Sequence, residues 1–347
     1  MAARVVLVTG ASRHLGGRLA RILADDPAIE RVIGVDVVPP PADLGGVEFV
    51  RADIRNPVIA KVITEAEVDT VVHMNVIATP LSAGGRASMK EINVIGTMQL
   101  LAACQKAPSL ARLVVKSSTT VYGNSPLDPA LFTEGMDAKA MPSSGYAKDS
   151  VEVEGYVRGF ARRRPDVGVT MLRFANFIGP ALHTPLTDYL SMPVVPTAFG
   201  FDPRLQFVHE DDGLEALRLA TVHERPGTFN VAGDGVLLLS QAIRRAGRVA
   251  LPVVRPLGGW VGQWVRRAGL ADFSPEQLSL LTWGRAVDTT LMREVFGFSP
   301  TYTTAAAYDD FLRVRRGPTP VEPERIAAVE EWLTTVVGDV TRRARGA

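Results

Sequence analysis

Short apolar runs alternate with longer amphipathic stretches through the first half of the chain. Near-continuous apolar runs, typical of parallel strands buried on both faces, occupy residues 4–10, 31–36, 47–53, 70–75, 112–118, 169–176 and 228–233. Helical patterns fall between them at residues 15–26, 91–107 and 150–164. Because strands and helices alternate, the sequence predicts an α/β fold built on a doubly wound parallel sheet.

The pattern changes after Asn176. Residues 178–203 form a proline- and glycine-rich stretch that is too long for an ordinary connection, and such loops are usually functional. We therefore expect residues 1–175 and 205–235 to form the sheet domain. Residues 176–204 and 236–317 should form a smaller substrate-binding region over the strand ends, followed by a linker and helix at 318–347.

Composition limits the classes of partner and compartment. The formal net charge of +1 gives no electrostatic case for binding nucleic acid. No apolar run approaches the roughly 20 residues of a transmembrane segment, and the first residues lack a signal-peptide pattern. Cys104 is the one cysteine and cannot form an internal disulfide, so we expect a soluble, cytoplasmic protein.

The stretch VTGASRHLGG, residues 8–17, occupies the first turn between strand and helix. Backbone N–H groups at that turn usually hold a dinucleotide pyrophosphate. The stretch resembles the phosphate loop of the short-chain dehydrogenase/reductase superfamily, in particular its extended branch of NAD-dependent epimerases and dehydratases. The extended branch favours the pattern TGxxGxxG, and Arg13 stands here in place of its middle glycine. The single-domain branch of the superfamily favours TGxxxGxG, and His14 stands in place of a glycine of that pattern.

Later segments match the same family in order over roughly the first 235 residues. They include Asp36 at the end of the second strand, RADIR around Asp53, TVVHMN, INVIGT, VVKSSTTVYG, LRFANFIGP and LQFVHEDD. The resemblance implies a Rossmann-type fold. It places the cofactor beside Gly10, Ser12, Arg13, His14, Leu15, Gly16, Asp36, Asp53, Ile54, Met74, Asn75, Asn93 and Tyr146. It places the substrate beside Ser118, Thr119, Tyr146 and Asn176.

The catalytic set that the resemblance implies lacks one member. The family uses a tyrosine as general base or acid, a serine that orients the substrate oxygen, and a lysine four residues after the tyrosine. Here the serine is Ser118 and the tyrosine is Tyr146, but Ser150 stands at the lysine position. Lys148 is two residues from Tyr146 and points to another face of the helix. Lys116 shares a strand face with Ser118, which makes it a candidate replacement, although its amine is expected to reach water at the sheet end.

Several of these residues also have purely structural interpretations. Ser117, Ser118 and Thr119 can cap a turn, Asn93 can bond its own helix, and His73 is expected to be a core residue rather than a metal ligand. Asp36 would repel a 2′-phosphate, so NAD is the expected cofactor and NADP the less favoured one, although Arg13 argues for NADP.

The resemblance implies an epimerase-like enzyme that acts by transient hydride transfer on a nucleotide sugar, and a homodimer is possible. Two alternatives remain. One is a reductase or dehydrogenase of another hydroxy or keto substrate; the other is a catalytically weak or inactive NAD(P)-binding sensor or assembly protein, which Arg13 and Ser150 favour.

Overall fold

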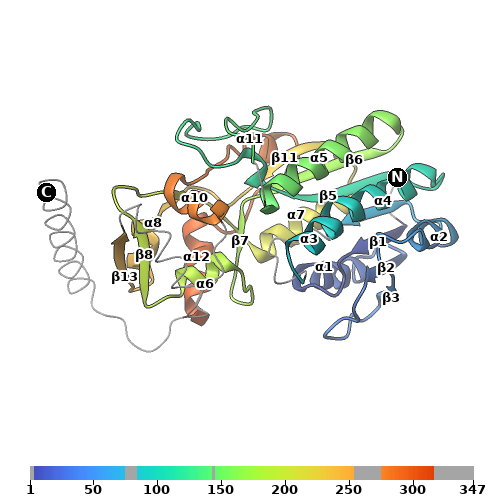
Figure 1. Ribbon diagram of the computed structural model, residues 1–347. Coiled ribbons are helices and arrows are strands. Elements are labelled where there is room, and N and C mark those ends of the chain that lie inside the picture. Colours follow the sequence, from blue (N-terminus) through green and yellow to red (C-terminus); the bar gives the residue numbers. More distant parts are fainter. Residues whose placement is uncertain (1–3, 75–83, 143–144, 254–274, 316–347) are drawn as a thin grey trace, which may run out of the picture.

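A seven-stranded parallel sheet forms the centre of the larger part of the molecule in a computed structural model that describes residues 4–74, 84–142, 145–253 and 275–315 (Figure 1). Its strand order is β11-β6-β5-β4-β1-β2-β3. The strands are β1 (Val5–Thr9), β2 (Arg31–Asp36), β3 (Glu48–Arg51), β4 (Thr70–His73), β5 (Arg112–Ser118), β6 (Gly168–Phe174) and β11 (Gly227–Val231). Each pair within it is parallel, so the expected α/β fold is confirmed. The strand order reverses between β1 and β4, which is where such sheets bind ligands.

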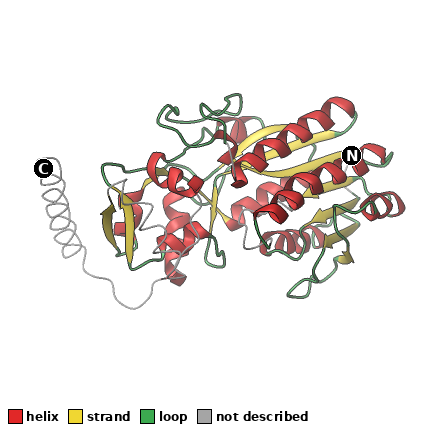
Figure 2. Ribbon diagram, in the orientation of Figure 1, coloured by secondary structure: helices red, strands yellow, loops and turns green. Residues whose placement is uncertain are grey.

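Helices cover both faces of this sheet (Figure 2). On one face α1 (His14–Ala24) and α7 (Glu210–Val222) bury leucines and alanines against apolar side chains of β1, β6 and β11. On the other face α2 (Val58–Glu65), α4 (Gly96–Lys106) and α5 (Gly145–Arg163) pack against the opposite side chains of β1, β4 and β5. Burial of the central strands on two faces explains their near-continuous apolar runs, whereas the edge strand β3 has no fully buried residue.

Three predicted boundaries differ from the structure. The run at 169–176 is split, because the chain leaves the large sheet after Phe174 and Asn176–Ile178 forms β7, which pairs with β10 (Phe207–His209). The helix predicted at 91–107 is a longer stretch composed of α3 (Arg86–Lys90), a π-helical turn η2 (Glu91–Ile95) and α4. Helix α5 begins at Gly145 rather than at residue 150, which places Tyr146 in its first turn.

Two short helices lie against the large sheet's elements: η3 (Thr119–Tyr122) packs on α5, and α11 (Thr290–Glu294) packs on β11. The other described elements form a smaller part beside the carboxyl ends of the large sheet (Figure 1). They are α6 (Pro185–Leu190), β8 (Val194–Ala198), β9 (Arg204–Leu205), β12 (Leu237–Leu238), α8 (Leu239–Arg245), β13 (Val249–Val253), α10 (Pro275–Trp283) and α12 (Thr304–Arg315). A separate apolar cluster, centred on Tyr189, Phe207, Tyr308 and Phe311, holds it together.

Two expectations fall outside the described residues: the linker and helix at 318–347, and the position of Asn75. In the part of the chain that the structure describes, no helix combines the length and the apolar character needed to span a bilayer.

Candidate active site

The turn between β1 and α1 depends on two of its glycines. Gly10 has a φ of 75°, and a Cβ atom on Gly16 would lie 2.1 Å from the carbonyl oxygen of Gly10. Arg13 occupies the middle-glycine position with φ −85° and ψ 154°, an extended conformation open to any residue, and its side chain is exposed. The missing glycine therefore does not disrupt the turn, which still brings the N-terminus of α1 against the end of β1.

Asp36 lies at the carboxyl end of β2, next to this turn. Its buried carboxylate accepts hydrogen bonds from the N–H groups of Ser12 (3.1 Å) and Val37 (2.7 Å), and the Ser12 hydroxyl donates to the Val38 carbonyl (2.5 Å). Arg51, which no sequence motif singled out, donates from Nε to the Val37 carbonyl at 3.0 Å. A carboxylate and a guanidinium thus flank the end of β2.

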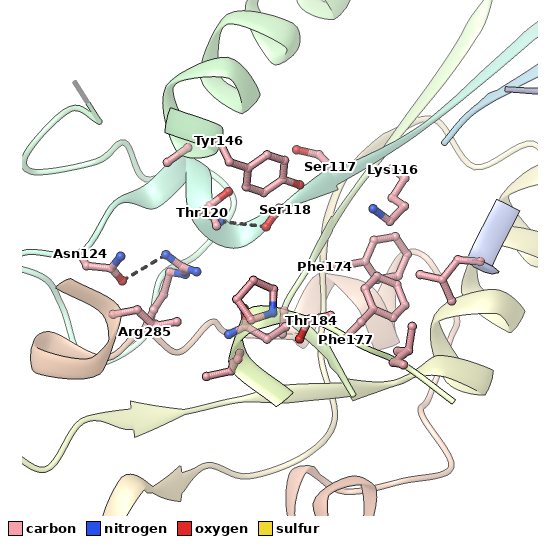
Figure 3. A pocket seen from close by; sticks show the side chains of 18 residues that line it. Lys116, Ser117, Ser118, Thr120, Asn124, Tyr146, Phe174, Phe177, Thr184 and Arg285 are labelled. Atoms are coloured by element: carbon pink, nitrogen blue, oxygen red, sulfur yellow. Dashed lines mark hydrogen bonds between the residues drawn. The ribbon is translucent and has the colours of Figure 1, made fainter. Parts of the chain in front are cut away.

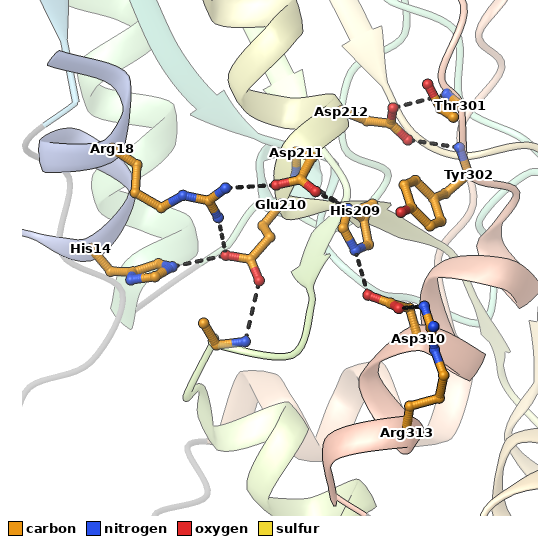
Figure 4. Close-up of polar contacts among 11 residues, drawn as sticks. His14, Arg18, His209, Glu210, Asp211, Asp212, Thr301, Tyr302, Asp310 and Arg313 are labelled. Atoms are coloured by element: carbon orange, nitrogen blue, oxygen red, sulfur yellow. Dashed lines mark hydrogen bonds and ion pairs between the residues drawn. The ribbon is translucent and has the colours of Figure 1, made fainter. Parts of the chain in front are cut away.

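His14, the first residue of α1, belongs to a cluster of polar contacts with α7 (Figure 4). Its Nε2 lies 2.8 Å from Oε2 of Glu210, a buried residue, and Nη1 of Arg18 lies 2.5 Å from the same oxygen. The other carboxylate oxygen of Glu210 accepts from the Ala181 N–H at 3.2 Å. Glu210 thereby connects α1 to the loop after β7, which was not expected from the sequence.

Four other residues expected at the cofactor are Asp53, Ile54, Met74 and Asn93, and none of them lines the pocket described below. Asp53 pairs with Arg55 at 2.6 Å, and Ile54 is buried. Met74 is buried, and its N–H donates to the Thr9 hydroxyl at 3.1 Å. Asn93 is buried in the π-helical turn, and its amide lies 3.4 Å from the Asp149 carboxylate.

A pocket of about 240 Å³ opens at the carboxyl ends of β5 and β6 (Figure 3). It brings together five residues that the sequence singled out: Leu15, Lys116, Ser118, Tyr146 and Asn176. The other lining residues are Ser117, Thr120, Asn124, Ala147, Phe174, Ala175, Phe177, Leu182, Thr184, Pro185, Leu186, Leu280 and Arg285. Lys148 does not line the pocket, as expected from its place on the helix.

Tyr146 lies beside Ser118 and Ser150. Burial raises the pKa of its phenol, and the hydroxyls of Ser150 and Ser118 together with the positive charge of Arg285 oppose that rise. The Ser150 hydroxyl donates to the backbone carbonyl of Tyr146 at 2.9 Å. The position that carries a lysine in the family is therefore occupied by a neutral group bonded within its own helix.

Lys116 lies in the pocket beside Phe174 and Phe177 (Figure 3). Its Nζ is 5.6 Å from the centre of the Phe177 ring, and burial lowers its pKa to about 8. His73, beneath it, has a pKa lowered to about 4 by burial and by the charge of Lys116. The His73 ring lies 2.9 Å from the hydroxyls of both Thr9 and Thr97, which makes it the core residue that was expected.

Arg285 is a pocket residue that no motif indicated. It follows Gly284, after α10, and is buried against the end of β5. Its Nε donates a hydrogen bond to Thr119 Oγ1 at 3.2 Å. Its Nη1 donates to the Gly123 carbonyl at 3.2 Å and to Asn124 Oδ1 at 3.1 Å. Burial lowers its pKa to about 10, so it stays charged at neutral pH. A charged residue in the otherwise uncharged run LTWGRAV, residues 281–287, was the one available signal.

Known proteins resemble this chain over most of its length. The sequence model of the NAD dependent epimerase/dehydratase family matches residues 6–232. An uncharacterized protein of Mycobacterium tuberculosis is 52% identical over 341 residues, which cover 96% of this chain and 89% of that protein. The UDP-glucose 4-epimerase of Mycolicibacterium smegmatis is 27% identical over 322 residues, covering 85% of this chain and 93% of the epimerase.

The fold also resembles solved structures. A UDP-glucuronic acid 4-epimerase from Bacillus cereus, in complex with UDP-glucuronic acid and NAD, superposes with a TM-score of 0.68. The match covers 90% of this chain and 99% of that structure at 18% sequence identity, so it bears on the fold alone.

Proposed function

The chain belongs to the NAD-dependent epimerase/dehydratase family, and on this premise we propose that it is an NAD-dependent enzyme that oxidises and re-reduces an oxygen-bearing carbon of a nucleotide sugar. The proposal is epimerase-like in class. The juxtaposition of Ser118 and Tyr146 in one pocket, next to Leu15 of the glycine-rich turn, is the observation that carries it.

The residues present fit a dinucleotide. Because Gly16 has no Cβ atom, the first turn of α1 packs directly on the carbonyl of Gly10, and the α1 N-terminus at this turn favours a pyrophosphate. Asp36 would hold the adenosine ribose hydroxyls. NAD, when bound, supplies the acceptor and donor of hydride. We infer that Asp36 makes NAD the preferred cofactor and NADP the weaker ligand.

Tyr146 and Ser118 would handle the proton of the reacting hydroxyl. In our proposal Ser118 orients the substrate oxygen by a hydrogen bond, and the Tyr146 phenolate takes its proton as the carbon is oxidised. On the reverse step Tyr146 returns the proton to the carbonyl oxygen. Because burial raises the pKa of Tyr146, a higher pH is needed to form the phenolate that accepts the proton.

The pocket also offers polar groups for the sugar. The hydroxyl oxygen of Thr120 is buried and has no hydrogen-bond partner among the described residues, so a sugar hydroxyl would satisfy it. Asn176, on β7, is proposed to contact the nucleotide sugar, as the family resemblance implies. Thr119, which the resemblance places beside the substrate, is buried, is not among the residues that line this pocket, and accepts a hydrogen bond from Arg285 at 3.2 Å.

One variant tests the proposed role of Tyr146. Tyr146→Phe removes the proton-transfer group and leaves the glycine-rich turn intact. We expect it to abolish interconversion of nucleotide-sugar epimers, followed by NMR of the products, and to leave NAD affinity within a few-fold in calorimetry. Unchanged turnover would show that Tyr146 is a packing residue and would refute the mechanism.

Ser150 favours a second candidate function. Without a cation at that position the protein could bind NAD and perform little or no catalysis, acting as a sensor or assembly partner. In that case NAD would bind, and no nucleotide sugar would reduce it. The cytoplasmic location, the possible homodimer and the division into a sheet domain and a substrate-binding region remain proposals.

A further inference from the structure

Arg285 is a buried cation whose bonded partners are neutral. Its three hydrogen bonds go to a hydroxyl, a backbone carbonyl and a side-chain amide, from Thr119, Gly123 and Asn124. Among the described residues none forms an ion pair with it, and its Nη2 nitrogen has no hydrogen-bond partner. Burying a charge without a counter-ion is costly, so a retained buried guanidinium indicates that an anion is supplied from elsewhere.

One carboxyl outside the pocket lining acts on Arg285 through its charge, that of Asp128. Its Oδ2 accepts from the Ser125 N–H at 2.7 Å, and its buried Oδ1 has no hydrogen-bond partner among the described residues. No hydrogen bond joins Asp128 to Arg285. Tyr122 and Tyr146 are the other titratable groups that act on the guanidinium, and both remain neutral phenols at neutral pH because burial raises their pKa values. The titratable groups around Arg285 therefore leave its guanidinium positively charged at neutral pH.

The other charged side chain that lines the pocket is also positive. Lys116 is a second cation in the lining, and none of the described lining residues is an aspartate or a glutamate. The two cations lie at different places: Arg285 beside Asn124 and across from Tyr146, and Lys116 beside Phe174 and Phe177 (Figure 3). Of the two cations, Arg285 is the one whose charge acts on Tyr146.

The backbone around Arg285 holds it in that place. Gly284 has a φ of 71°, and a Cβ atom there would lie 2.5 Å from the backbone nitrogen of Arg204. The N–H of Arg285 donates to the Arg204 carbonyl at 3.1 Å. A fixed main chain and three side-chain hydrogen bonds orient the guanidinium before any ligand arrives, which favours specific recognition of a planar anion.

We propose that Arg285 binds a carboxylate of the substrate close to the carbon that Ser118 and Tyr146 act on, so that the protein selects an acidic sugar over its neutral counterpart. This inference rests on the proposed function for the identity of the reaction. The recognition of a carboxylate by Arg285 is a separate claim about the pocket. The diphosphate of a nucleotide is the other anion that could reach a guanidinium, and the test separates the two.

The test compares ligands that differ in one group. Calorimetry on the full-length, NAD-loaded protein measures the affinities of UDP-glucuronic acid, UDP-glucose and UDP. Because a hydrogen bond to a charged group contributes about 1.5–3 kcal/mol, we expect UDP-glucuronic acid to bind about 10- to 140-fold more tightly than UDP-glucose. Arg285→Gln, which keeps a polar side chain, should remove that preference and leave the affinity for UDP unchanged. Arg285→Lys should retain part of it.

A matched control removes the same charge elsewhere. Arg21 is exposed on α1, and Arg21→Met should leave the preference intact. The proposal is overturned if the wild-type protein binds the neutral and acidic ligands equally. It is also overturned if Arg285→Gln weakens UDP as much as UDP-glucuronic acid, which would place the diphosphate at Arg285.

A second measurement keeps this claim separate from the proposed function. If no UDP compound binds, the nucleotide-sugar function fails, and the melting temperature with sodium glucuronate or glucose then tests Arg285 alone. A stabilisation by glucuronate over glucose that Arg285→Gln abolishes and Arg21→Met preserves would sustain the carboxylate site. Equal stabilisation of all three proteins would refute it.

Discussion

Ser150→Lys tests whether the missing cation controls the proton transfer proposed for Tyr146. Residues four apart on a helix lie about 5–6 Å from each other at Cβ, so a lysine at position 150 would place an ammonium beside the buried phenol. At about 5 Å and an effective dielectric constant of about 20, a unit charge contributes roughly 3 kcal/mol in favour of the phenolate. This corresponds to about two pKa units, and desolvation of the new ammonium reduces it to about one.

The direction of the pH dependence follows from the burial of Tyr146. Burial raises its pKa, so the natural protein's activity should rise with pH into the alkaline range. In Ser150→Lys the pH–rate profile should shift to lower pH by about one unit, and ultraviolet titration of the tyrosinate should shift with it. Ser150→Met, which adds similar bulk without charge, is the matched control. Identical profiles for the lysine and methionine variants would refute the placement of Tyr146 in proton transfer.

Two further predictions concern cations and cofactor choice. Calorimetry should show that the wild-type protein binds NAD more tightly than NADP. Asp36→Ala should reduce this difference in affinity, because it removes the repulsion between the carboxylate and a 2′-phosphate. A wild-type preference for NADP would instead identify Arg13 or Arg51 as a ligand of the 2′-phosphate. Burial lowers the pKa of Lys116 to about 8, below its value in the unfolded chain. Between about pH 8 and 10 the unfolded state therefore binds more protons than the folded state, so the free energy of unfolding should rise with pH in that range. Denaturant unfolding should show that rise in the wild-type protein relative to Lys116→Met, and parallel pH curves for the two proteins would contradict the buried position of this amine.

The sequence predicted the sheet well because its strands are buried on both faces and leave a strong apolar pattern. Parallel sheets bind ligands at the carboxyl ends of their strands, and the family motifs lie at those ends. Lys116, Ser118, Tyr146 and Asn176, which the sequence singled out on these grounds, all line the pocket at that edge of the sheet. The sequence did not predict that β6 ends at Phe174, because the apolar run continues through Ala175, whose N–H still bonds to the Val231 carbonyl. The chain then pairs in a different sheet from Asn176.

Two charged residues could not be predicted because distant segments create their environments. Glu210 is buried because Gly179 leaves room for it: a Cβ atom on that glycine would lie 2.4 Å from the carboxylate oxygen. Arg285 reaches the end of β5 from more than 160 positions away in the sequence. Neither neighbourhood is encoded in local periodicity, so only the folded chain shows what these charges contact.

The reduction of bound NAD by substrate is the most direct test of the proposed chemistry. The NAD-loaded protein should be mixed with neutral and acidic nucleotide sugars while the absorbance of reduced nicotinamide is followed in a stopped-flow spectrometer. We predict a transient band with at least one of these sugars, strongest with an acidic one, that Tyr146→Phe does not produce. Firm binding of NAD and of the sugars with no reduction at any pH would contradict the account and would leave a nucleotide-binding protein without hydride transfer.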